Sequence, residues 1–113
     1  KEFIDITAEK RGLSYTIETI AQDHPVEMHP AMIREIEEAV KSVGVEYMTI
    51  PSGAGHDAMH WAEVVPTGMI FIPCRDGISH NPAEFAEMDD IVTGAAVLDK
   101  VLRKLSLEET KLV

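Results

Sequence analysis

The chain has a single cysteine, Cys74, among its 113 residues. One cysteine cannot form a disulfide within the chain, so the sequence excludes the disulfide scaffold of many small secreted proteins. No apolar run approaches the roughly 18 residues that a membrane-spanning helix needs. No signal peptide opens the chain, whose first residue is Lys1. These absences favour a cytoplasmic protein.

Positive charge is also scarce. The chain carries 10 Lys and Arg against 20 Asp and Glu, which gives a formal net charge of −10. Nucleic acids and anionic membrane surfaces are both bound through clustered basic side chains. We therefore expect neither nucleic acid nor a membrane among the partners. The acidic surplus is typical of a protein that its own charge keeps dispersed.

Aromatic residues make up only 5% of the sequence, whereas hydrophobic residues make up 45%. Aliphatic side chains and methionine must therefore fill the core. The length suits one domain or part of one. Because Lys1 already lies within a predicted helix, we expect the chain to be a piece of a longer protein.

Helices are predicted at four places along the chain. The first covers 2–11 and ends before Gly12, and the second opens at His29-Pro30 and ends at Gly44. A third follows the loop 52–57 and runs to about Val64, and the fourth starts at Asp89-Asp90, with 106–113 as a frayed polar tail. Apolar residues at helical spacing predict the buried stripe of the second helix (Met32, Ile33, Ile36, Val40, Val43) and of the last (Ile91, Ala95, Leu98, Leu102, Leu105).

Three segments carry strand patterns. Residues 13–19 alternate between apolar and polar side chains, as in a half-buried strand. Residues 46–50 (Glu-Tyr-Met-Thr-Ile) are predicted to form a short strand that Pro51 stops, and 68–72 are apolar throughout, as in a strand covered on both faces. The order of elements predicts an α/β fold with a parallel or mixed sheet and flanking helices. The segments 46–50 and 68–72 with the helix between them would form a right-handed β-α-β unit.

The loop after 68–72 presents His80, which is followed by the turn-forming pair Asn81-Pro82. A neutral imidazole at the carboxyl edge of a sheet is a common ligand for zinc or manganese. The alternative is a histidine that hydrogen-bonds its own loop. Glu84 is either a second-shell carboxylate that orients the imidazole or a solvated loop residue.

The loop Ser52-Gly-Ala-Gly-His-Asp-Ala58 joins the other predicted strand to a helix. Gly53 and Gly55 allow the backbone to approach a ligand and to adopt positive φ. The alternative, which a glycine pair before a helix favours by itself, is an ordinary tight turn. His56 and Asp57 are ionisable. Asp57 is either a second-shell group or a helix cap.

Together these residues resemble a known family of enzymes. The loop Ser52–Ala58, the segment Met69-Ile-Phe-Ile-Pro73 and the motif Gly77-Ile-Ser-His-Asn-Pro-Ala-Glu84 are similar to the C-terminal part of the amidase/hydantoinase-carbamoylase family. This family is related to the dinuclear-zinc exopeptidases and contains N-carbamoyl-L-amino acid hydrolases, allantoate amidohydrolases and β-ureidopropionases. The resemblance runs from the first helix to Leu105.

The resemblance implies a division of the chain. In the family, an α/β catalytic domain with two divalent metal ions is interrupted by a lid domain that also forms the dimer. Residues 1–23 would be the last helix and strand of the lid, and 24–113 the final segment of the catalytic domain. His80 would be a metal ligand, and Gly53, Gly55 and His56 would hold the carboxylate end of a small-molecule substrate.

The same resemblance implies what the chain lacks. The bridging Asp, the general-base Glu, the other metal ligands and the substrate-gripping Arg precede this segment in the family. We therefore expect the parent protein to hydrolyse a carbamoyl or ureido C–N bond with zinc or manganese, and the isolated chain to bind no metal and to be inactive. The alternative is a stand-alone binding module that retains the scaffold. In either case we expect a homodimer or self-association through open strand edges.

Overall fold

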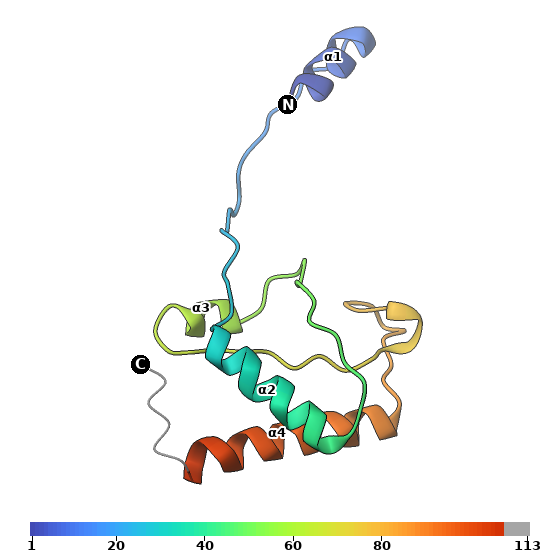
Figure 1. Ribbon diagram of the computed structural model, residues 1–113. Helices are drawn as coiled ribbons and strands as arrows, with labels where there is room; N and C mark the ends of the chain where they lie inside the picture. The colour runs from blue at the N-terminus through green and yellow to red at the C-terminus, as the bar shows by residue number, and fades with distance from the viewer. Residues whose placement is uncertain (108–113) are drawn as a thin grey trace.

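The computed structural model describes residues 1–107, and its helices follow the predicted order (Figure 1). The elements are α1 (Glu2–Arg11), α2 (Pro30–Val43), α3 (Ala58–Ala62), the short 3₁₀ turn η1 (Arg75–Gly77) and α4 (Met88–Leu107). Of the polar tail predicted for 106–113, the part from 108 onward lies outside the described residues. Within residues 1–107, no helix is both long enough and apolar enough to cross a membrane.

The ends of the long helices follow their local signals. Pro30 is the first residue of α2, and the side chain of His29 caps the helix by accepting a hydrogen bond from the Ala31 N–H at 3.2 Å. Gly44 ends α2 with a left-handed φ of 83°, and its N–H bonds the carbonyls of the last turn. Gly12 ends α1 in the same way. The predictions for these helix boundaries are confirmed, whereas α3 is shorter than expected.

The core lies between α2 and α4, which are the two helices that pack on each other within the described part of the chain. Its buried residues are Ala39 and Val40 from α2 and Val97 and Val101 from α4. Partly buried side chains surround them: Met32, Ile36, Val43, Ile70 and Leu105. The predicted stripe of α2 is thus confirmed at Met32, Ile36, Val40 and Val43.

The stripe predicted for α4 is largely wrong. Val97 is only 2% exposed, whereas Leu98 and Leu102 are 48% and 57% exposed. The helix carries apolar side chains on two faces, and α2 packs against the face that holds Val97 and Val101. Periodicity alone could not choose between the two faces, because that choice depends on the tertiary partner.

Residues 1–107 contain no paired β-strand, so the predicted sheet does not form within this part of the chain. The three predicted strand segments, 13–19, 46–50 and 68–72, run as coil in Figure 1. A strand forms through backbone hydrogen bonds to a neighbouring strand. Within residues 1–107, no neighbouring strand pairs with these segments. The α-helical layer of the predicted fold is present without its sheet.

Two glycines let the segment 68–72 lie against both helices. A Cβ atom built on Gly94 in α4 would lie 2.5 Å from Ile72 Cγ2, and one built on Gly68 would lie 2.8 Å from Ile36 Cδ1 in α2. A side chain at either position would therefore require Ile72 or Ile36 to shift. This close approach holds 68–72 along the helix pair without strand pairing.

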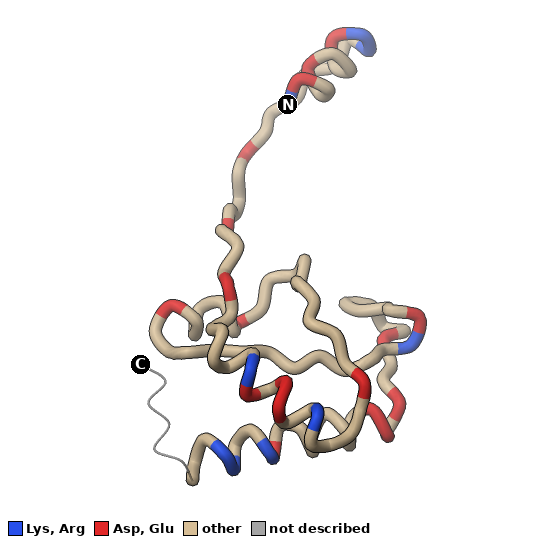
Figure 2. Tube along the Cα trace, in the orientation of Figure 1, with Lys and Arg blue, Asp and Glu red and all other residues tan. Residues whose placement is uncertain are grey.

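Charged side chains also join the two helices. The Lys104 ammonium on α4 forms ion pairs with Glu35 and Glu38 on α2, the second at 2.8 Å. Figure 2 shows acidic residues at the start of α4 and basic residues toward its end, which suits the helix dipole.

The first helix projects away from the rest of the molecule (Figure 1). The principal extents are 65 × 35 × 20 Å and the Cα radius of gyration is 20.1 Å. A compact chain of about 100 residues has a radius near 13 Å. The extended residues 12–29 account for this excess, and the proposed boundary between 1–23 and 24–113 stays a prediction.

Candidate functional site

A broad groove lies beside the helix pair, and the predicted strand segments form part of its lining. It has a volume of about 1450 Å³ and is lined by residues 23–28, 45–56 and 69–73, with one side of α2 and of α4. Thr49 anchors its wall to α2, because its hydroxyl donates to Glu37 at 3.2 Å. Small-molecule sites usually measure about 300–1,000 Å³, so this groove offers room for more than one small ligand.

The loop predicted to bind substrate lies in the wall of this groove. Ser52, Gly53, Gly55 and His56 all line it. The His56 Nε2 atom lies 2.7 Å from the Ser52 hydroxyl oxygen. The His56 ring also meets the Phe71 ring edge to face, with centroids 5.5 Å apart and an interplanar angle of 63°. His56 is therefore held from two sides on the groove wall.

Gly53 and Gly55 are not required by the fold of this chain. Neither has a positive φ, and no atom of the described residues lies within 4 Å of a Cβ built on either. The positive-φ explanation considered from the sequence is therefore wrong. The space beside both glycines is open, which leaves room for a ligand to approach the backbone.

Asp57 precedes α3 without capping it. Its side chain makes no hydrogen bond to the helix, although its carbonyl accepts from the N–H groups of His60 and Trp61. The cap interpretation is therefore wrong, and the second-shell role stays a prediction.

His80 occupies a left-handed backbone conformation with φ of 54° on an exposed loop. Its backbone N–H donates to Glu84 Oε2 at 3.0 Å. The Asn81 side chain accepts from the Ala83 N–H at 2.9 Å, and the Asn81 carbonyl accepts from the Glu84 N–H at 2.9 Å. The motif thus folds on itself, with Glu84 bonded to the backbone of His80 and not to its imidazole.

Arg75 closes the base of this loop. Its N–H donates to the Phe85 carbonyl at 2.7 Å, its guanidinium pairs with Glu87 at 2.9 Å and stacks over the Phe85 ring at 4.0 Å. Sequence analysis missed this brace. Phe85 and Glu87 lie at least ten residues from Arg75 along the chain. This separation exceeds any helical or strand spacing, so the residue pattern gave no signal for these contacts.

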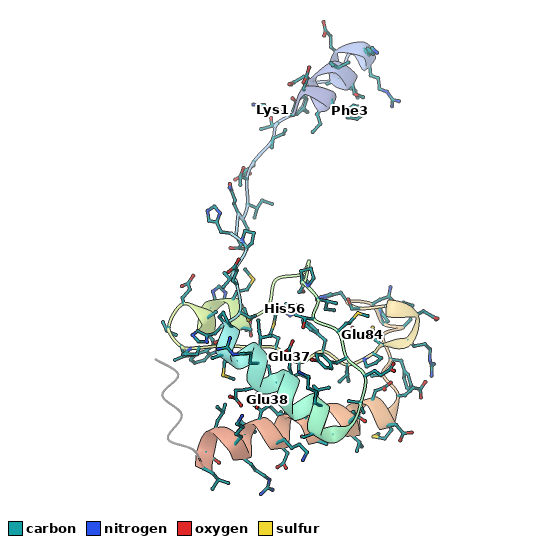
Figure 3. All side chains as sticks on the ribbon, in the orientation of Figure 1. Lys1, Phe3, Glu37, Glu38, His56 and Glu84 are labelled. Atoms are coloured by element: carbon teal, nitrogen blue, oxygen red, sulfur yellow. The ribbon has the colours of Figure 1, made fainter. Side chains whose placement is uncertain are left out.

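The structure does not bring all of the predicted site residues together. His80 and Glu84 do not line the groove, and Figure 3 shows His56 and Glu84 on separate loops. Within residues 1–107, no three His, Cys, Asp or Glu side chains gather closely enough to hold a metal ion. The residues present therefore do not fit a metal centre by themselves, because a catalytic site needs about three protein ligands.

A model of peptidase family M20/M25/M40 matches residues 4–104. The chain belongs to this family. The resemblance drawn from its two loops is thereby confirmed.

Similar proteins of this family carry amidohydrolase names. The chain is 44% identical over 98 residues to an N-carbamoyl-L-amino-acid amidohydrolase of Pseudomonas sp. (strain NS671), covering 87% of this chain and 24% of that protein. It is 35% identical over 101 residues to an allantoate amidohydrolase of Escherichia coli (strain K12), covering 89% and 25%. The crystal structure of AtUAH in complex with (S)-hydroxyglycine matches with a TM-score of 0.84 and 34% identity, over 95% of this chain and 26% of that one. The chain thus spans about a quarter of the length of these relatives.

Proposed function

We propose that this chain is one part of a longer amidohydrolase that cleaves a carbamoyl or ureido C–N bond in a small carboxylate. An N-carbamoyl-L-amino acid or allantoate is the substrate class that the similar proteins suggest. The observation that carries the proposal is the Ser52–His56 loop, which lies on the wall of a groove much larger than one small ligand fills. The remainder of a fourfold longer protein would occupy most of that space.

Each predicted site residue has a role in this proposal. The open backbone beside Gly53 and Gly55 admits the carboxylate end of the substrate, and His56 donates a hydrogen bond to it. His80 contributes one imidazole to a centre of two divalent ions, zinc or manganese. Asp57 and Glu84 orient these residues without contacting the metal ions or the substrate. The other metal ligands and the general base belong to the rest of the parent protein.

The same proposal explains the unpaired segments. Residues 46–50 and 68–72 pair with strands supplied by the remainder of the parent and so complete the sheet of the α/β domain. These segments line the groove, so strands from the remainder of the parent would pair there.

The test compares this chain with its full-length parent. Release of ammonia from an N-carbamoyl-L-amino acid and from allantoate is measured with zinc or manganese added. We expect activity from the parent and none from the isolated chain, because the proposal places the general base and the other metal ligands in the rest of the parent. A parent that hydrolyses neither substrate, or an isolated chain that matches its parent, contradicts the proposal.

A second candidate function is a binding module that associates with another copy of itself. Large apolar side chains stay exposed on two parts of the molecule, with Phe3 79% and Ile20 94% exposed on the projecting segment and Met48 79% exposed at the groove. Burial of such surfaces drives association. We propose that the isolated chain dimerises through them. Light scattering after size exclusion over a hundredfold concentration range tests this, and a monomer throughout contradicts it.

A further inference from the structure

The hydroxyl of Ser52 lies 2.7 Å from His56 Nε2, at the loop that the proposed function assigns to substrate binding. We propose that Ser52 is a positioning residue that holds the neutral His56 imidazole with its proton on Nδ1. Only the consequence of this inference for substrate binding rests on the proposed function, because the hydrogen bond itself lies within the described chain.

Counting protons limits the hydrogen bond to two directions. The Ala54 N–H donates to Ser52 Oγ at 3.2 Å, so one acceptor site of the hydroxyl is used. The single hydroxyl proton goes either to His56 Nε2 at 2.7 Å or to the Ala54 carbonyl at 3.3 Å, and in the second case His56 is the donor. A distance of 2.7 Å is usual for a hydroxyl donor and is the short limit for an N–H donor, whereas 3.3 Å is long for a hydroxyl donor. The distances therefore favour Ser52 as the donor to Nε2.

This direction sets the tautomer of His56. A neutral imidazole that accepts at Nε2 carries its proton on Nδ1. Within residues 1–107, the His56 ring makes no other hydrogen bond, so Nδ1–H stays available to a ligand in the groove. The edge-to-face contact with Phe71 limits rotation of the ring. Ser52 and Phe71 together prepare one donor of fixed direction for a carboxylate or carbonyl oxygen.

The arrangement does not resemble a serine nucleophile. A nucleophilic Ser–His pair needs a third group that orients the base, and the neighbouring Asp57 side chain makes no hydrogen bond to the ring among the described residues. The Ser52 oxygen is also tied to the loop backbone by Ala54. These contacts suit an anchor for the imidazole.

The direct test is the ¹⁵N NMR spectrum of the His56 ring in the isolated chain, at a pH where the ring is neutral. We expect Nδ1 to show the shift of a protonated nitrogen and Nε2 that of an unprotonated one. Ser52→Ala should give mixed tautomers, whereas Ser52→Thr, which keeps the hydroxyl, should restore the Nδ1–H form. A wild-type ring protonated at Nε2, or a Ser52→Ala spectrum identical to wild type, overturns the inference.

The consequence for substrate binding is tested in the full-length parent. We expect Ser52→Ala to raise KM about five- to tenfold, as for loss of one hydrogen bond, with kcat within twofold because the bond supports binding of the substrate and of the transition state equally. Ser52→Thr should recover the wild-type KM. Ser42→Ala, a serine outside the groove, is the matched control.

The two proposals fail in distinguishable ways. If His56→Ala raises KM and Ser52→Ala does not, the positioning role is overturned while the proposed function stands. If Ser52→Ala changes the tautomer but neither variant changes KM, the structural inference stands and the binding role proposed for His56 fails.

Discussion

At the residue scale, the fold does not require the glycines of the Ser52–His56 loop, whereas the proposed function does. Gly53 and Gly55 have neither a positive φ nor a neighbour that a Cβ would strike. We expect Gly53→Ala and Gly55→Ala to leave the urea-unfolding free energy of the chain within about 0.5 kcal/mol of wild type. In the full-length parent, the same variants should weaken substrate binding at least tenfold, because the added methyl fills the space left for the ligand.

Gly94→Ala is the matched control for this experiment. A methyl on Gly94 would strike Ile72, so this variant should destabilise the chain although alanine favours a helix by roughly 1 kcal/mol over glycine. If Gly53→Ala and Gly55→Ala destabilise the chain as Gly94→Ala does, the loop glycines are structural and their assignment to substrate is wrong.

Glu84 offers a second prediction at this scale. Its carboxylate accepts the His80 backbone N–H at 3.0 Å and so holds the left-handed turn that presents the imidazole. We expect Glu84→Ala to lower the metal affinity of the full-length parent about tenfold or more, in the range known for outer-shell partners. Glu84→Gln should stay near wild type, because its amide oxygen still accepts.

Metal affinity measured by competition with a chelator checks this expectation. If Glu84→Gln lowers the metal affinity as much as Glu84→Ala does, Glu84 acts through its negative charge and not through the hydrogen bond that holds the turn.

At the scale of elements, the contact between α2 and α4 should depend on pH. The hydrogen bond and charge of Lys104 lower the pKa of Glu38 below its ordinary value of 4.5. A carboxylate whose pKa is lower in the folded state stabilises the fold above its unfolded pKa, and this contribution is lost as the pH falls through the lower folded value. Lys104 has a raised pKa, so its own contribution is lost only in strong alkali.

We therefore expect Lys104→Met to flatten the loss of stability between pH 6 and pH 3. Urea midpoints at several pH values measure this slope, with Lys10→Met on the separate α1 as the control. An unchanged slope in Lys104→Met would show that the ion pairs with Glu35 and Glu38 do not form in solution.

Elements differ in how far the sequence predicts them. The boundaries of α2 were predictable because Pro30 and Gly44 act within a turn of their own positions. The buried face of α4 was not, since both of its faces are apolar and α2 selects the one with Val97. The strands were expected from their composition, but 46–50 and 68–72 have no hydrogen-bonded neighbour in the described chain.

The candidate site shows the same division. The loops that hold His56 and His80 were found because glycine and proline mark turns after apolar segments. The Ser52–His56 hydrogen bond and the Arg75 brace were not foreseen, because each depends on how a loop folds back on itself. Sequence patterns locate loops and do not give the contacts within them.

At the scale of the whole molecule, residues 1–23 and the helix pair should behave as independent units. Within the described residues, α1 packs on no other helix, and it stands apart from the α2–α4 pair in Figure 1. We expect a chain that begins at residue 24 to keep the unfolding midpoint of the full 113 residues. A fall of more than about 0.5 kcal/mol in unfolding free energy would show that the first segment supports the core, contrary to the proposed boundary.

We propose above all that this chain forms one wall of the site of an amidohydrolase and that the rest of the parent protein completes that site. Reconstitution tests it most directly: the preceding part of the parent is made separately, mixed with this chain, and assayed on an N-carbamoyl-L-amino acid with added zinc or manganese. We expect hydrolysis only after mixing, and loss of at least a hundredfold when the chain carries His80→Ala. Tight assembly of the two parts without any hydrolysis, or activity of the preceding part alone, would contradict the claim.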